Sequence, residues 1–206
     1  MSADSDEARN PQRFIHATVI YTMDCAGSLV FKGGTSLSKG WNLIQRFSED
    51  IDLALDREYL GFSGELEYAD VRRLRRKSYG YLTKTFTPEL QKRFAEVGFT
   101  DVTIKYREVP NHDQYPMVIE IYYPKLTEKE TYLKPGVLVE VGSRSLVEPF
   151  TDRTFTTMVA ENYPGLPYSD EPISVPTVNP ERTFLEKIFL LHKGFQKPEE
   201  KRRVEG

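Results

Sequence analysis

Two acids alternate with apolar residues in the segment 50–55 (DIDLAL), and this alternation limits how the chain can fold there. In a β-strand successive side chains point to opposite faces, so Asp50 and Asp52 would share one face while Ile51 and Leu53 point to the other. Two carboxylates placed this way repel each other unless a cation lies between them. Mg²⁺ or Mn²⁺ takes hard oxygen ligands, usually carboxylates together with substrate phosphates. The segment therefore predicts a strand that buries one face and carries a site for a metal ion and a triphosphate on the other.

A glycine pair precedes these acids and ends an apolar strand pattern at 29–31. Glycine lets the backbone turn tightly and approach a ligand without a side chain in the way. We expect a helix after the turn, capped by Thr35 or Ser36, with Leu43 among the residues that face the core. The first amides of such a helix favour a bound phosphate, and a lysine one turn later would reach the same anion. The predicted phosphate-binding residues are Gly33, Gly34, Thr35, Ser36 and Lys39.

The rest of the chain mixes helical and strand periodicities. A helix is expected over 65–96, with a new helix starting at Pro88. Strand patterns occupy 101–107, 117–123 and 137–141. The stretch 149–176 is expected to be loop-rich, because its prolines prevent long regular elements. A last helix is predicted to begin at Asn179-Pro180-Glu181, with apolar residues at helical spacing, namely Phe184, Ile188, Leu191 and Phe195. This order predicts an α/β (α+β) domain in which helices flank a mixed sheet.

Length and composition are those of a single folded domain. The chain has 206 residues, of which 39% are hydrophobic and 29% charged. We expect a flexible leader over 1–14, a core over 15–176 and a C-terminal helix and tail over 177–206. Cys25 is the one cysteine, which excludes an intrachain disulfide, and it is expected to be a small core residue. This cysteine usage fits a reducing, cytoplasmic setting, and the apolar runs are far too short to cross a bilayer.

Positive charge is concentrated in one short window, although the net charge is −3 and does not indicate a nucleic-acid-binding protein. The window 72–77 contains Arg72, Arg73, Arg75, Arg76 and Lys77. A run of this kind is usually the solvated face of a helix. The alternative interpretation is a patch that contacts the phosphates of a nucleic acid.

Three segments together resemble a known family. The segments 31–40 (FKGGTSLSKG) and 46–55 (RFSEDIDLAL) resemble the DNA polymerase β-like nucleotidyltransferase superfamily, and more narrowly the AbiEii/AbiGii toxin family. The segment 179–187 (NPERTFLEK) is similar to a later motif of the same family. The resemblance implies a polymerase β-like nucleotidyltransferase core. It also implies a third acid on a neighbouring strand, for which Glu140 is preferred and Glu120 is the competitor.

The resemblance also assigns candidate roles. Asp50, Asp52 and Glu140 are the expected catalytic and metal-binding residues, and Lys187 is expected to contact a nucleotide phosphate. Two further nucleotide-binding candidates precede the acid-bearing strand. Arg46 either contacts phosphate or pairs with a neighbouring acid, and Ser48 is expected first to hydrogen-bond the turn before the strand. Family members continue into an Arg-His-x-x-Asp pattern that is absent here, so 177–206 is expected to be an incomplete form of the family's helical region.

The implied activity is transfer of a nucleoside monophosphate from a nucleoside triphosphate (NTP) to an acceptor, with RNA such as tRNA as the expected acceptor. The implied role is that of the toxin in a bacterial toxin–antitoxin or abortive-infection system, with a cognate antitoxin as partner. Two alternatives stay open at the level of the sequence. One is modification of a small molecule, as antibiotic nucleotidyltransferases do, and the other is a non-catalytic module that binds a nucleotide or a partner.

Overall fold

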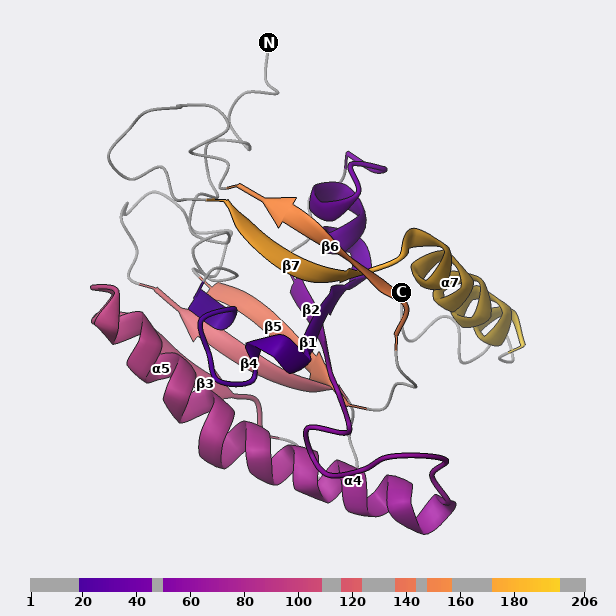
Figure 1. Cartoon of the computed structure of the whole chain (residues 1–206), viewed down its shortest axis with the longest axis horizontal. Helices are drawn as coiled ribbons and strands as arrows, with labels where there is room; N and C mark the ends of the chain where they lie inside the picture. The colour runs from indigo at the N-terminus through magenta and orange to yellow at the C-terminus, as the bar shows by residue number, and fades with distance from the viewer. Residues whose placement is uncertain are drawn as a thin grey trace.

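The computed structural model describes residues 19–45, 50–108, 116–123, 136–143, 148–156 and 172–196. They form a seven-stranded sheet in the order β3-β4-β5-β2-β1-β7-β6 (Figure 1). The strands are β1 (Leu29–Lys32), β2 (Asp50–Leu55), β3 (Thr103–Tyr106), β4 (Met117–Tyr122), β5 (Gly136–Gly142), β6 (Phe150–Phe155) and β7 (Ile173–Val178). The helical elements are η1 (Ala26–Ser28), α3 (Gly33–Thr35), η2 (Ser36–Gly40), α4 (Tyr68–Tyr81), η3 (Leu82–Phe86), α5 (Thr87–Glu96) and α7 (Pro180–Phe195).

The sheet is mixed, because its central strand β2 pairs antiparallel with β1 and parallel with β5. On one side of this centre, β1 pairs parallel with β7, which pairs antiparallel with β6. On the other side, β5, β4 and β3 follow in antiparallel order. The predicted α/β class with a mixed sheet is therefore confirmed.

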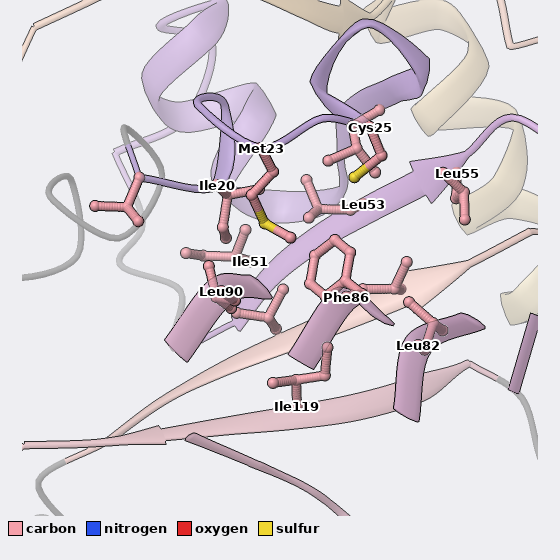
Figure 2. Close-up of a cluster of buried hydrophobic side chains, with 14 of the residues drawn as sticks. Ile20, Met23, Cys25, Ile51, Leu53, Leu55, Leu82, Phe86, Leu90 and Ile119 are labelled. Carbon is pink, nitrogen blue, oxygen red and sulfur yellow. The ribbon is translucent and has the colours of Figure 1, made fainter. Parts of the chain in front are cut away.

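One face of the sheet is covered by the long helical layer formed by α4, η3 and α5 (Figure 1). Ile51 and Leu53 of β2 are buried on this side, in one cluster with Phe86 of η3 (Figure 2). Asp50 and Asp52 are half-buried on the opposite side, which we call the acid face. The alternation expected for 50–55 is confirmed. Burial of the apolar side chains in the core is what holds the two acids on the acid face.

The helix expected over 65–96 is present as the consecutive segments α4, η3 and α5. α4 begins after Glu67, whose carboxylate and that of Asp70 form a reciprocal capping box with backbone N–H groups. Pro88 lies in the first turn of α5, directly after the π-helical segment η3. Proline has no N–H and crowds the carbonyl four residues earlier, so a widened turn at this point lets the helix continue through it.

The stretch 149–176, expected to be loop-rich, contains two short strands that the sequence did not predict, β6 and most of β7. Proline normally argues against a strand, yet Pro176 lies inside β7, opposite Asp152 of β6. β1 and β7 pair at the register position of Phe31 and Thr177, next to this proline. The expected boundary of the core at 176 falls inside β7.

The helix after the glycine pair also begins earlier than predicted. α3 starts at Gly33, with Lys32 as its N-cap and no side-chain cap hydrogen bond, so the prediction that Thr35 or Ser36 caps it is wrong. Gly33 has φ +77°, a left-handed conformation that glycine adopts without strain, and this lets the chain turn at once into the helix. Leu43, expected to face the core, lies beyond the helix and is exposed.

α7 begins where predicted, with Pro180 at its first position after Asn179. The stripe of apolar residues expected to accompany it is present but faces solvent in the part of the chain that the structure describes. The exposed side chains are Phe184, Leu185, Ile188, Phe189, Leu190, Leu191 and Phe195. Thr183 is the buried residue of this helix. No helix among the described residues is both long and apolar enough to span a bilayer.

Gly33 lies against the acid-bearing strand more closely than any side chain would allow. A Cβ atom built on Gly33 would stand 1.7 Å from Oδ2 of Asp52. The glycine is therefore required twice, for its positive φ and for this approach. Gly64 offers a comparison, because it has a similar φ of +69° but nothing within 4 Å of a built Cβ.

We expect Gly33→Ala to lower the free energy of unfolding more than Gly64→Ala does. Both variants should lose roughly 1–3 kcal/mol for a left-handed non-glycine residue. Gly33→Ala should lose more, because its methyl group must displace the Asp52 carboxylate. Urea denaturation of the two variants measures the difference. Equal losses would mean that the close approach of Gly33 to Asp52 does not exist in solution.

Candidate active site

One row of residues crosses the acid face from β1 to the end of β3. Lys32 pairs in register with Asp52, and Asp52 pairs with Glu140 on β5. Val118 of β4 is next to Glu140, and its carbonyl accepts a hydrogen bond from the backbone N–H of Arg107 at 2.8 Å. Opposed residues on neighbouring strands lie about 5 Å apart with side chains on the same face. The row thus places two carboxylates side by side, with a cation beyond them at each end.

Asp50 adds a third carboxylate on the same face. It precedes Asp52 by two residues on β2 and stands opposite Leu138 of β5. Asp50, Asp52 and Glu140, which we call the acid cluster, therefore come from two neighbouring parallel strands. The sequence prediction that Asp50 and Asp52 share a face, with an acid from another strand beside them, agrees with this geometry.

The structure separates the two glutamates that competed for the position of third acid. Glu120 lies on β4, one strand beyond β5, and its carboxylate accepts a hydrogen bond from Nε of Arg107 at 2.8 Å and one from the Tyr122 hydroxyl at 2.6 Å. Glu140 stands directly beside Asp52. The geometry favours Glu140, because Glu120 is one strand further away and already has a cation and a hydroxyl as partners.

Electrostatics around Asp52 reflect crowding by like charge. Burial raises the pKa of Asp52, Lys32 lowers it, and Asp50 raises it further. Two residues of α7 have opposite effects on this pKa, because Lys187 lowers it and Glu186 raises it. The net shift is upward, so the described cations do not fully offset the burial and the neighbouring acids.

Glu140 shows the same imbalance. Burial raises the pKa of Glu140, and the carboxylates of Asp52 and Asp50 add to the rise. Arg107 and Lys32, the two cations of the row, lower it without cancelling the effect. A group of carboxylates that is still short of positive charge after its lysine and arginine neighbours are counted is suited to bind a further cation.

The donor chemistry of the acid cluster fits Mg²⁺ or Mn²⁺. Asp50 and Asp52 offer carboxylate oxygens on one face, and the missing side chain of Gly33 lets the Asp52 carboxylate lie directly against the glycine turn. Within the described ranges, no group of three or more acidic, histidine or cysteine side chains is gathered closely enough to ligate a single ion by itself. Magnesium sites built from one or two carboxylates plus substrate phosphates do not need such a group.

The hydroxyls of Thr35 and Ser36 in the glycine-rich turn are hydrogen-bonded to backbone carbonyls of the protein. The Thr35 hydroxyl donates to the Asp50 carbonyl at 2.8 Å, and the fully buried Ser36 hydroxyl donates to the Gly33 carbonyl at 2.9 Å. The Thr35 hydroxyl therefore holds α3 against β2, and the Ser36 hydroxyl closes the helical turn on itself. The N–H groups at the start of α3 have no partner within the helix and are the groups suited to a phosphate. Lys39 is half-buried in the last turn of η2.

Neither cation of the row, Lys32 or Arg107, was among the site residues predicted from the sequence. Lys32 carried a usable signal, because it follows Phe31, and alternation places it on the opposite face from that apolar residue. Its position opposite Asp52 depends on the register between β1 and β2. Arg107 had no local signal, since its approach to Glu140 requires three strands to pair in register.

The remaining site predictions have different outcomes. Arg46 and Ser48 lie outside the described residues, so their roles stay predictions. Cys25 is buried in the core, as expected.

The basic run belongs to α4, whose buried Leu74 packs with the core on the side of the sheet opposite to the acid face. Within this run Arg73 pairs with Asp70, and Arg72 lies over the ring of Tyr68. These neighbours on the same helix favour the interpretation as a solvated helix face.

Comparison with known proteins identifies the family. No curated protein matches the sequence. The sequence model of the family described as "Nucleotidyl transferase AbiEii toxin, Type IV TA system" matches residues 21–204, most of the chain, including the acid cluster, the glycine-rich turn and α7. The chain therefore belongs to the AbiEii family of nucleotidyl transferase toxins of type IV toxin–antitoxin systems.

Proposed function

We propose that this protein transfers a nucleoside monophosphate from an NTP to an acceptor hydroxyl at the acid cluster. The observation that carries the proposal is the juxtaposition of Asp50, Asp52 and Glu140 on one face, beside the glycine turn and flanked by cations. The upward pKa shifts of Asp52 and Glu140 support it, because they indicate an electrostatic need for a further cation. Family membership supports the class of reaction.

Asp50 and Asp52 would hold Mg²⁺ or Mn²⁺, and Glu140 would complete the site of a second ion. Bound there, the metal supplies positive charge that neutralises the triphosphate and stabilises the attacking and leaving oxygens of an in-line displacement.

The chain's own groups bind and orient the reactants. Backbone N–H groups at the start of α3, together with Lys39 and Lys187, hold the phosphates. Glu140 accepts the proton of the acceptor hydroxyl, a role suited to a carboxylate with a raised pKa. The acceptor oxygen bonds to the α-phosphorus while the bond from that phosphorus to the pyrophosphate oxygen breaks. The nucleoside monophosphate is transferred and pyrophosphate leaves.

We propose RNA as the acceptor, and a toxin role restrained by a cognate antitoxin. Support for a polyanionic acceptor comes from Lys32, which places positive charge on the acid face beside Asp52. An RNA backbone is attracted to cations placed this way. A small-molecule acceptor and a non-catalytic binding role predict different results in the assay described next.

Asp52→Asn should reduce transfer by at least about two orders of magnitude, the scale for loss of one preorganised electrostatic contact to the reacting group. The assay incubates the protein with each α-³²P-labelled NTP, Mg²⁺, and either total RNA or aminoglycosides. The variant should fold, because asparagine has nearly the same shape as aspartate. Transfer by Asp52→Asn at the wild-type rate would refute the mechanism.

A matched control and the choice of acceptor separate the competing functions. Asp152 is also a strand aspartate, but it lies exposed on the edge strand β6, so Asp152→Asn should leave transfer unchanged. Label on RNA supports the RNA acceptor, and label on aminoglycosides supports the small-molecule alternative. Nucleotide binding in calorimetry without release of pyrophosphate supports the non-catalytic module.

The same Asp52→Asn variant should be more stable than the wild type at neutral pH. The folded-state pKa of Asp52 is raised, so the unfolded chain releases this proton at lower pH than the folded one does. Stability is therefore lost as pH rises from the ordinary carboxyl range through the raised folded pKa. The substituted amide does not titrate, so Asp52→Asn should have a higher melting temperature near pH 7, and the difference should disappear below pH ~3, where both side chains are neutral. A lower melting temperature for the variant at pH 7 would contradict the crowding of the acids.

We expect the basic run of α4 to contribute little to acceptor binding, because it lies on the helix-covered side of the sheet. Replacing Arg72 and Arg76 with glutamine should leave unchanged the slope of log acceptor affinity against log salt concentration. Filter binding of labelled RNA across a salt series measures this slope. A slope smaller by about one for each arginine removed would instead show that the acceptor extends to α4.

A further inference from the structure

A buried ion pair joins the start of α7 to the chain segment before β6. The side chain of Glu148 is 3% exposed, and its two oxygens receive Nε of Arg182 at 2.7 Å and Nη2 at 3.4 Å. A carboxylate buried to this extent requires a partner, and the two-point geometry of the guanidinium fixes direction as well as distance. Neither residue belongs to the acid cluster.

Further polar contacts strengthen the same junction. The backbone N–H of Asn179 donates to the Pro149 carbonyl at 2.9 Å, and the Thr151 hydroxyl donates to Oδ1 of Asn179 at 2.8 Å. Arg182 also reaches Oε1 of Glu186 at 3.3 Å, one turn further along the helix. The first turn of α7 is therefore tied to residues 148–151 by directional contacts.

The rotation of this first turn decides where Lys187 points. In an α-helix, residues four apart lie on the same face, so Lys187, whose side chain is exposed, is one turn beyond the buried Thr183. The effect of Lys187 on the pKa of Asp52 agrees with this orientation. The large apolar side chains do not set the rotation among the described residues, since Phe184 is 64% and Phe189 67% exposed.

We propose that Arg182, held by Glu148, is a positioning residue that orients α7 so that Lys187 faces the triphosphate beside Asp52. This inference rests on the proposed function, because it assumes that Lys187 contacts the substrate's phosphates. Arg182 acts through Lys187 and does not itself contact the nucleotide.

The test compares Arg182→Lys and Arg182→Met with the wild type, each in the presence and absence of Lys187→Ala. Lysine keeps a positive charge opposite Glu148 but cannot make the two-point contact of the guanidinium. Arg182→Lys should therefore fold even if Arg182→Met does not. We expect KM for the NTP to rise by about tenfold or more with a smaller change in kcat, as misplacement of a binding group predicts. In the Lys187→Ala background the Arg182 substitutions should have no further effect on KM, because coupled residues are not additive. An equal rise of KM with and without Lys187 would overturn the proposal.

Arg93 provides a matched control. It also joins a helix to a distant segment, with Nη2 at 3.1 Å from Oδ1 of Asp24, and it also pairs with an acid one turn away, Glu89, at 3.6 Å. It lies on α5, in the layer on the other side of the sheet. Arg93→Met should therefore leave KM unchanged. A rise equal to that of the Arg182 variants would mean that the effect is a general loss of stability.

Amide hydrogen exchange separates failure of this proposal from failure of the proposed function. Exchange in the first turn of α7 should be faster in Arg182→Lys than in the wild type and unchanged in Arg93→Met. If the wild type transfers no nucleotide, the proposed function fails, and the exchange rates still decide whether Arg182 anchors α7. Unchanged exchange in Arg182→Lys would overturn the inference by itself.

Discussion

The site depends on the burial of one face of β2, because this burial forces like charges together on the other. Ile51 and Leu53 are fixed in the core under the helical layer, so Asp50 and Asp52 cannot leave the acid face without a shift of register. Each buried apolar side chain contributes about 1.5–3 kcal/mol. Asp52 and Glu140 are opposed on neighbouring strands about 5 Å apart, and their repulsion is roughly 1–3 kcal/mol at effective dielectric constants between water and the protein surface. The free energy gained by burying several such side chains therefore exceeds the repulsion between the carboxylates, and this repulsion persists in the folded state.

The protein's own cations reduce this repulsion without removing it. Lys32 and Arg107 stand at the two ends of the row across the sheet, yet the pKa values of Asp52 and Glu140 stay raised. A sequence selected for stability alone would replace one of these acids or add another basic residue. Keeping the imbalance makes sense when the missing charge is supplied by a bound ligand, which is the usual reason why local rules of stability fail at functional sites.

Local periodicity predicted the elements whose pattern is contained in a few neighbouring residues. The alternation in 50–55, the long helix around Leu74 and Phe86, and the strand bearing Glu140 are examples. The prediction failed where the outcome depends on distant segments. β6 and β7 are strands because they pair with each other and β7 pairs with β1, which the proline-rich composition of that stretch concealed. The place of Arg107 in the site has the same origin, since it depends on the registers of β3, β4 and β5.

α7 shows a second limit of periodicity, because a hydrophobic stripe indicates which side chains share a face but not whether anything covers them. The stripe through Phe184 and Ile188 is exposed in the described part of the chain, and the helix meets the protein through Thr183 and the ion pair of Arg182. Hydrophobic burial is non-directional and would tolerate small rotations of the helix. Hydrogen bonds and a two-point ion pair are directional and do not tolerate such rotations. A helix that must direct one lysine toward a cluster of acids is better held by such polar contacts than by an apolar face.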